Sequence, residues 1–494
     1  MSMRSEVLKD SSILTVLSFF SKGLSFIASI LVARMLLPDQ LGLLDLAVTF
    51  VISIFSIFSL NIHFGLSRII PSSKDKGRVI SAGLSAIFIL SIIGLIIFFI
   101  IQPIIVSNFN INLAKLYILV LFSGFCFVFF IAFQYVAQGM EDFFYYNLSV
   151  ILQSSIFFLL ILLDFFFILP FGVRNNLVSG AILFYLVSYF VPIFYGFFRF
   201  KHLFVFSTFK DIINILKQCI AEFSAPLLLS AFIILLQKFI FFGVFPAELG
   251  QSRVIDVTLM LITIPMLSLG TVLFPKLTKI NIIKIDSNMY NILFARLLIF
   301  SSFYIFLINS VAYYFIIIFF SSKYILAAQL FSFGALSSLF GTIFGLSNIV
   351  MFSMNQFKQR WLFLSILMNI ITFILTFWLI PIYGLFGLLL LTSIIQLIGI
   401  IFVFDALKKV IIFSKAKEMF FYSLLVTVFI LLNGVVVQLN PLIWFVYTCF
   451  SGLVLCFFAV NFHLLTKEDF ELILNGINYV KNKIESSISI FSKV

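Results

Sequence analysis

The stretch Pro38-Asp-Gln-Leu-Gly42 separates two long apolar runs, and a similar stretch, Pro246-Ala-Glu-Leu-Gly250, separates two more runs 208 residues later. Two further pairs of helix-end motifs repeat at offsets of 204 and 211: Ile69-Ile-Pro71 with Leu273-Phe-Pro275, and Leu169-Pro-Phe-Gly172 with Ile380-Pro-Ile-Tyr-Gly384. Proline and glycine are common at helix ends, so one such pair is a weak signal. Three pairs at nearly one spacing predict two homologous halves of six helices each.

The composition around these motifs is that of a membrane protein. Of the 494 residues, 63% are hydrophobic and 10% are charged, and the mean hydropathy is +1.24, whereas soluble proteins average about 25% charged residues. A 20-residue apolar window predicts fourteen spans, near residues 13–37, 41–62, 79–101, 113–137, 144–169, 177–198, 219–245, 256–277, 291–320, 326–352, 361–381, 384–407, 418–438 and 441–465. This composition predicts an all-α polytopic membrane protein and excludes a sizeable soluble catalytic domain.

Lysine and arginine gather in every second segment between the predicted spans. These segments hold 23 of the 31 basic residues, whereas the alternate segments hold only Lys115, Arg174, Arg253 and Lys323. Because cytoplasmic loops carry the excess of positive charge, both termini are predicted to be cytoplasmic and the number of spans even. A nucleic-acid binder would gather its bases on one face, so nucleic acid is not an expected partner.

These boundaries predict five parts of the chain. They are an N-terminal six-helix lobe (1–198), a cytoplasmic basic amphipathic linker (199–218), a C-terminal six-helix lobe (219–407), two additional transmembrane helices (408–465) and a cytoplasmic amphipathic tail (466–494). A tail of this composition either lies in the membrane interface as a helix or is disordered. Spans of equal orientation in both lobes predict a parallel repeat with a substrate site between the lobes.

The sequence shows no motif for catalysis. It contains no phosphate-binding loop, nucleophile elbow, H-E-x-x-H or calcium loop. Its three histidines and four cysteines are scattered without metal-ligand spacing. We therefore expect no catalytic residue, no metal and no cofactor, and a protein that is not an enzyme.

Charged residues inside the spans are the candidates for a substrate pathway, because each costs about 2.5–3.5 kcal/mol at a helix centre. Lys22 lies nine residues into the first predicted span, about 13 Å deep and near the midplane. Lys238 lies on the equivalent helix of the second half. The other candidates fall near predicted span ends, where a side chain can instead reach the membrane surface: Arg34, Asp45, Asp164, Glu222, Asp256 and Arg296. Of these, Arg34 and Arg296 suit a phosphate, which guanidinium groups bind in a bidentate manner.

Several motifs resemble those of the polysaccharide transporter family, the O-antigen flippases of the multidrug, oligosaccharidyl-lipid and polysaccharide exporter superfamily. These motifs are Ser21-Lys-Gly-Leu-Ser25, Ala33-Arg-Met-Leu-Leu-Pro38, Leu273-Phe-Pro275-Lys-Leu-Thr278 and Leu379-Ile-Pro-Ile-Tyr-Gly384. The chain departs from the family pattern at Gly387-Leu-Leu-Leu390, where small alanines are usual. This departure weakens expectations about helix packing at that turn.

The resemblance implies a V-shaped, MATE-like pair of six-helix lobes in the bacterial inner membrane. It implies a flippase for an undecaprenyl-pyrophosphate-linked oligosaccharide in O-antigen or lipopolysaccharide biosynthesis. The implied partners are this lipid-linked substrate, the bilayer, a polysaccharide polymerase and a chain-length regulator.

Three alternatives remain open at this point. A MATE-type drug or cation antiporter would favour acidic residues deep in the lobes, whereas the deepest charge here is Lys22. A lipid II flippase would move a substrate that is chemically similar to that of an O-antigen flippase. An O-antigen polymerase or ligase would resemble proteins with one large periplasmic loop, which the spacing of the predicted spans does not provide.

Overall fold

The computed structural model describes residues 3–109, 114–220, 225–279, 287–353, 358–407, 416–438 and 440–461. Within these ranges all regular secondary structure is helical. The predicted amphipathic tail (466–494) and Glu222 lie outside the described residues.

Two sets of helices form the two halves, with a linker between them. The first half contains α1 (Met3–Met35), α2 (Pro38–Phe58), α3 (Ile62–Ser72), α4 (Lys76–Phe109), α5 (Ala114–Met140), α6 (Phe143–Phe167), α7 (Val173–Asn176) and α8 (Val178–Phe200). The linker contains η1 (Lys201–Leu203) and α9 (Phe209–Cys219). The second half contains α10 (Ala225–Val244), α11 (Pro246–Lys279), α12 (Ser287–Phe315), η3 (Ile316–Phe320), η4 (Ser322–Tyr324), α13 (Ile325–Ser353) and α14 (Lys358–Leu407), and it is followed by α15 (Ala416–Val436) and α16 (Pro441–Asn461).

The prediction of about fourteen transmembrane helices is confirmed. Twelve helices of the described chain are long and apolar enough to cross a membrane. One of these stretches, Gln359–Leu407, contains two helices, because the backbone is non-helical at Gly384 (φ 55°, ψ −130°). Only glycine adopts this conformation readily, and Glu248 accepts a hydrogen bond (2.7 Å) from the N–H of Leu385, which starts the second helix. Together with the 34-residue α11, the described chain has fourteen long helices.

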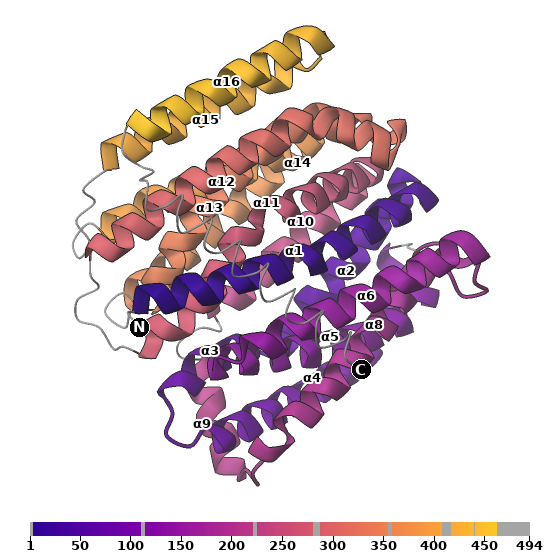
Figure 1. The fold of residues 1–494 in the computed structure, drawn as a ribbon. Helices are drawn as coiled ribbons and strands as arrows, with labels where there is room; N and C mark the ends of the chain where they lie inside the picture. Colours follow the sequence, from indigo (N-terminus) through magenta and orange to yellow (C-terminus); the bar gives the residue numbers. More distant parts are fainter. Residues whose placement is uncertain are drawn as a thin grey trace, which may run out of the picture.

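The two halves repeat one packing arrangement. The first helix of each half packs on the fifth, as α1 does on α6 and α10 on α14, and the second packs on the fourth, as α2 does on α5 and α11 on α13. Figure 1 shows the first half in indigo to magenta beside the second half in rose to orange. The halves meet where α1 and α2 pack against α10 and α11.

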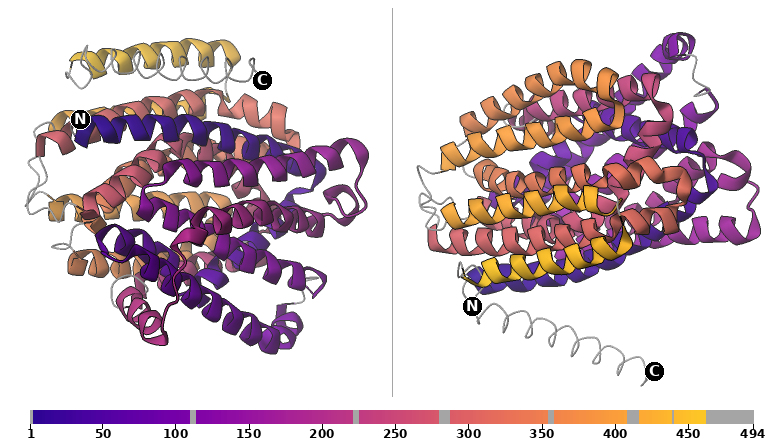
Figure 2. Two further views of the ribbon diagram at one scale, coloured as in Figure 1. Left: turned by 60° about the horizontal axis from the view of Figure 1, so that its bottom comes forward. Right: turned by 90° about the horizontal axis from the view of Figure 1, so that it is seen from above.

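Helices α15 and α16 lie outside this pair of lobes. Helix α15 packs on α12 and α13, and α16 packs on α15 and α12. Figures 1 and 2 show α16 at the periphery of the second half. Large side chains of α16 such as Leu442 and Leu453 are exposed, as expected for a helix that faces lipid on most sides.

Two helices begin before the predicted starts of their spans. Spans were expected to begin at residues 41 and 256, whereas α2 begins at Pro38 and α11 at Pro246. Proline suits the first position of a helix because its φ is already helical and its missing N–H has no intrahelical partner there. The polar first turns lowered the apolar average of the window, which moved the predicted starts inward. Counted from the observed starts, Asp45 and Asp256 lie seven and ten residues inside their helices.

The second predicted span, 41–62, is broken in the structure. Helix α2 ends at Phe58 and α3 begins at Ile62, with Leu60 and Asn61 in the left-handed region at φ 51° and 52°. Helix α3 then continues through Pro71 to Ser72. The 20-residue apolar average does not detect this break, although the polar residues Ser59, Asn61 and His63 interrupt the apolar run there.

Candidate functional site

The two repeated proline motifs pack directly on each other. A Cβ atom added to Gly42 would overlap the carbonyl oxygen of Pro246, and one added to Gly250 would overlap that of Pro38. Absence of a side chain at both glycines therefore lets the first turns of α2 and α11 approach backbone to backbone. We call this end of the bundle the proline end, and the opposite end, with η1 and α9, the linker end.

A second set of contacts joins the halves at the proline end. The Arg34 guanidinium of α1 donates hydrogen bonds to the carbonyl oxygens of Ile318 (2.8 Å) and Phe319 (2.7 Å), which belong to the π-helix η3. In return, the Lys323 ammonium donates to the carbonyl oxygens of Arg34 and Leu36 at the end of α1. Each cation satisfies carbonyls that a helix end or a π-turn leaves unpaired. In this conformation Arg34 therefore closes the proline end.

Four charged side chains from both halves form one cluster below this seal. Lys238 Nζ on α10 lies 2.7 Å from Asp45 Oδ2 on α2 and 3.7 Å from Asp256 Oδ2 on α11. Arg253 Nη1 on α11 lies 3.3 Å from Asp45 Oδ1. The Asp45 side chain is 3% exposed, so both of its oxygens are committed to cations of the other half. The structure thus brings together three of the sequence-predicted residues.

Arg253 is the member that the sequence analysis missed, since it was assigned to an outer loop. A signal for it was present, because Arg253 lies 208 residues after Asp45, the offset that relates Pro38 to Pro246. Equivalent positions in two symmetric halves meet across the symmetry axis. Applying the repeat offset to each charged residue would therefore have paired Asp45 with Arg253.

Lys22 lies near this cluster but differs from its members. It is partly buried in α1, within electrostatic range of Arg253. No hydrogen bond or ion pair to Lys22 exists within the described part of the chain. A charged residue at this depth without an ionic partner is costly, so a role for Lys22 in the substrate pathway stays a prediction.

A cavity of about 880 Å³ extends between the halves, mainly along α10, α11, α13 and α14. It is lined by Asp256 and Lys238 toward the proline end and reaches residues of both halves toward the linker end, where Gln138 donates a hydrogen bond (3.2 Å) to the Thr271 carbonyl. Asp256 is 53% exposed because it faces this space. The lining includes many amide and hydroxyl side chains: Gln138, Gln237, Gln396, Asn348, Ser252, Ser337, Ser338, Thr263, Thr271, Thr342 and Thr392.

The remaining predicted site residues lie away from the cluster. Asp164 is fully buried, and its carboxylate accepts hydrogen bonds from the N–H groups of Leu169 (3.0 Å) and Arg174 (3.1 Å), which shapes the turn from α6 to α8. Arg296 belongs to α12, and its side chain lies outside the described residues. Glu222 is likewise outside them. A role for these three residues in a substrate pathway stays a prediction.

Solved structures of transporters share this arrangement. The chain is similar to the lipid II flippase MurJ in an inward closed conformation, with a TM-score of 0.69 and 15% identity over 91% of this chain and 98% of MurJ. It is also similar to the Vibrio cholerae MATE transporter VcmN (TM-score 0.62, 13% identity, 83% and 99% of the two chains) and to the MATE multidrug transporter DinF-BH (0.61, 14%, 83% and 97%). Comparison with curated protein sequences finds no match. These likenesses show that the chain has the fold of MurJ and of the MATE transporters.

Comparison with models of sequence families identifies the family of this chain. The model for polysaccharide biosynthesis proteins matches residues 7–281, more than half of the chain. The chain therefore belongs to the polysaccharide biosynthesis protein family, and it is a multi-pass membrane protein with the fold of transporters.

Proposed function

We propose that this protein is a flippase that moves an undecaprenyl-pyrophosphate-linked oligosaccharide, an O-antigen or other surface-polysaccharide repeat unit, across the bacterial inner membrane. The observation that carries the proposal is the cavity between the halves, which is rich in amide and hydroxyl groups and has Lys238 and Asp256 of the ion cluster in its wall. Membership in the polysaccharide biosynthesis family supports the same substrate class.

The lining suits the two chemical parts of such a substrate. Amides and hydroxyls such as Gln237, Asn348 and Thr392 can donate and accept hydrogen bonds, as the hydroxyls of a sugar require. Among the described residues, Lys238 and Arg253 pair with the carboxylates of Asp45 and Asp256, whereas Lys22, within electrostatic range of Arg253, pairs with no carboxylate. One positive charge is therefore in excess, and it favours a pyrophosphate or an acidic sugar.

The same contacts suggest how binding is coupled to opening. The ion pairs of Asp45 with Lys238 and Arg253 join the first half to the second. A bound phosphate group competes with the Asp45 carboxylate for these cations, since both are oxygen anions that suit lysine and arginine. Binding would then weaken the link between the halves, and the proline end would open by rocking of one half against the other.

The orientation that fits this transport places the linker end and both termini in the cytoplasm, with the proline end facing the periplasm. A polymerase and a chain-length regulator would then take the product at the proline end. Reporter fusions after Asn440 should report the periplasm and fusions after Lys415 the cytoplasm. The opposite pattern would overturn this orientation.

Transport is tested by deleting the gene in its host and restoring it as variants. We expect the deletion strain to lose surface polysaccharide and to accumulate the lipid-linked repeat unit on the cytoplasmic side. Lys22→Ala should fail to restore export at normal protein level, whereas Lys22→Arg should restore part of it because the charge is kept. Normal export by Lys22→Ala would show that Lys22 only reaches for the membrane surface.

Reconstituted protein separates the alternatives. In proteoliposomes, we expect the lipid-linked oligosaccharide to be flipped, and lipid II and a cationic drug to be moved at least tenfold more slowly, about 1.4 kcal/mol of discrimination. Equal transport of lipid II would identify a lipid II flippase. Exclusive transport of the drug would identify an antiporter.

A further inference from the structure

The linker between the halves is docked on the first half. Helix α9 packs on α4 and α3, burying Ile212, Ile215 and Cys219. The preceding strand-like segment lies on the first turns of α4, where the N–H of Val205 donates to Ser81 Oγ (2.9 Å). One face of α9 is therefore fixed against the first half.

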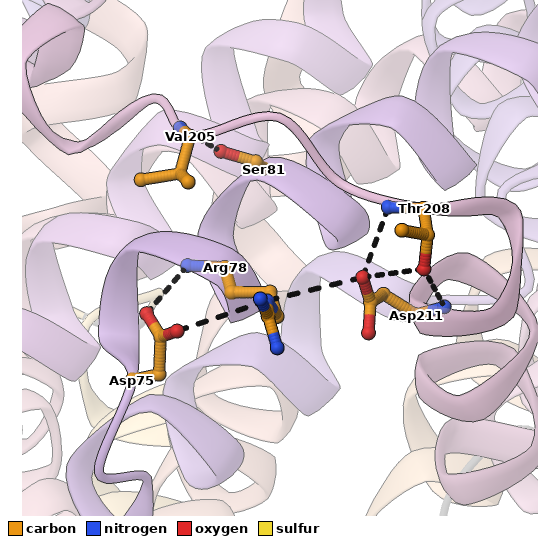
Figure 3. Close-up of polar contacts among 6 residues, drawn as sticks. All are labelled: Asp75, Arg78, Ser81, Val205, Thr208 and Asp211. Atoms are coloured by element: carbon orange, nitrogen blue, oxygen red, sulfur yellow. Dashed lines mark hydrogen bonds and ion pairs between the residues drawn. The ribbon is translucent and has the colours of Figure 1, made fainter.

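Polar contacts fix the start of α9 to the same place (Figure 3). Asp211 Oδ2 accepts hydrogen bonds from the backbone N–H (2.9 Å) and the hydroxyl (2.7 Å) of Thr208, which caps the helix. These hydrogen bonds from Thr208 lower the pKa of Asp211, so its carboxylate is charged at neutral pH. Arg78 Nε lies 3.9 Å from Asp211 and 3.7 Å from Asp75, so Arg78 connects α4 to the linker.

The opposite face of α9 is basic and solvent-exposed. Lys210 and Lys217 stand two helical turns apart on the side away from the buried residues, with Asn214 between them, and all three are exposed. Lys201 and Lys74, near the ends of α8 and α3, are also exposed. None of these four lysines makes an ion pair within the described residues. Their charge is thus available to a ligand.

Exposed aromatic rings flank these lysines. Phe206 is 89% exposed and Phe209 is 73% exposed. The segment that carries Phe206 begins against the membrane helix α8, because the Phe204 ring lies 5.3 Å from that of Phe197, and Phe197 and Phe198 are themselves exposed. Aromatic rings beside lysines at the end of a membrane span are typical of a segment that lies in the lipid interface.

We propose that the face of the linker formed by Lys201, Phe206, Phe209, Lys210 and Lys217 is a docking surface for anionic membrane lipids. The two phenylalanines insert at the boundary of headgroups and acyl chains, and the lysines bind the headgroup phosphates. Continuity with the lipid-facing rings of α8 selects membrane lipid over a soluble protein as the occupant. Because α9 is fixed to α3 and α4, this surface anchors the first half while the second half moves.

The surface is tested by hydrogen exchange of the full-length protein in lipid nanodiscs. Amides of residues 204–219 should exchange more slowly in nanodiscs of phosphatidylcholine with phosphatidylglycerol than in phosphatidylcholine alone. Each lysine near an anionic surface contributes roughly fivefold in affinity, so the Lys210→Gln/Lys217→Gln variant should bind anionic lipid roughly 30-fold more weakly and lose the difference. Asn214→Gln, on the same exposed face, is the matched control and should keep it.

Further experiments distinguish lipid insertion from simple anion binding as the cause of slowed hydrogen exchange. Phe206→Ser/Phe209→Ser should reduce protection in both lipid mixtures, because insertion is lost. Inorganic phosphate added to phosphatidylcholine nanodiscs should have no effect; protection by phosphate alone would make this a simple anion site and overturn the proposal. Equal exchange in both lipid mixtures, or an unchanged difference in the double lysine variant, would also overturn it. These measurements need no transport substrate, so they are independent of the proposed function.

Discussion

Helices α2 and α3 in the first half and α11 in the second occupy equivalent places in the repeat, yet they differ in two ways. The first-half pair is broken at Leu60 and Asn61, whereas α11 runs without interruption from Pro246 to Lys279. At the position related by the offset of 208, one half has Asp45 and the other has Arg253. Identical halves would place like charges together at the axis, which is unfavourable. Here the two positions carry opposite charges and form an ion pair instead.

The break in the first half and the difference in charge give the two halves different structures at their interface. The continuous α11 contacts the first half at both ends, through Gly250 at the proline end and Thr271 at the linker end. The interruption between α2 and α3 provides a point where the first half can bend between those contacts. We therefore expect substitutions in equivalent positions of the two halves to have unequal effects.

The largest effect is expected from removing the acid of the ion pair. Asp45→Asn leaves the charges of Lys238 and Arg253 without their shared partner, and breaking a buried pair in this way costs about 3–5 kcal/mol. The measurement is the free energy of unfolding in detergent micelles. Asp39→Asn, on the exposed first turn of the same helix, is the control and should change this free energy by less than about 0.5 kcal/mol.

A double variant that swaps the charges of Asp45 and Arg253 makes this test more specific. If the halves were interchangeable, Asp45→Arg combined with Arg253→Asp would restore full stability. We expect only partial recovery, because Lys238 lies 2.7 Å from Asp45 and would then face an arginine. Complete recovery would mean that Lys238 does not depend on Asp45.

An intermediate effect is expected at the backbone contact of the proline end. Gly250→Ala places a Cβ against the Pro38 carbonyl, and overpacking of this kind costs about 1–3 kcal/mol. The closed conformation should therefore become about 5- to 150-fold less populated. Cross-linking between cysteines at Asp39 and Ala247, in a background without the four native cysteines, reports this population.

Gly243→Ala is the matched control for this contact, since nothing lies within 4 Å of its added Cβ. Its cross-linking should equal that of the parent. The same cross-link should block export reversibly if the proline end must open in each cycle. Undiminished cross-linking in Gly250→Ala, or normal export by the cross-linked protein, would argue against rocking about this contact.

The smallest effect is expected at the break itself. Asn61 has a left-handed backbone, and its side-chain amide nitrogen Nδ2 is buried without a hydrogen-bond partner in the described structure. Asn61→Gly should therefore stabilise the protein by about 1 kcal/mol. Ser268, equivalent to Leu60 by the offset of 208, lies within the continuous α11, so Ser268→Gly should destabilise by about 0.5–1 kcal/mol. The free energy of unfolding of both variants, measured with denaturant, tests this expectation. Changes of the same sign in the two variants would contradict a difference between the halves.

The number, order and approximate limits of the helices follow from the sequence, because a bilayer demands about 20 apolar residues for each span. Gly384 between the last two helices of the second half was also predictable, since the Pro381 and Gly384 pair is a strong end signal. The starts at Pro38 and Pro246 were not found, because their first turns are polar and hydropathy averages ignore capping.

The site was only partly predictable, because depth in a helix says nothing about the direction in which a side chain points. Lys238 was identified as a deep charge, but its partners come from two other helices. Arg34 was expected to suit a phosphate, yet its guanidinium binds two carbonyls of η3. The π-turn that exposes these carbonyls arises from tertiary packing, and no local pattern in residues 316–320 announces it.

The seal at the proline end has a consequence for energy coupling. Arg34, Lys323 and Tyr324 all donate to main-chain carbonyl oxygens of the other half or its boundary, and a carbonyl cannot be protonated in the physiological range. The acceptors of these contacts are therefore indifferent to acidity at the proline end, and the contacts of Lys323 persist while its ammonium stays protonated. The carboxylates of Asp45 and Asp256 are the groups at the interface that a proton or a metal cation can neutralise. Of these two sets of contacts, only the ion cluster therefore contains carboxylates on which a proton or cation gradient could act.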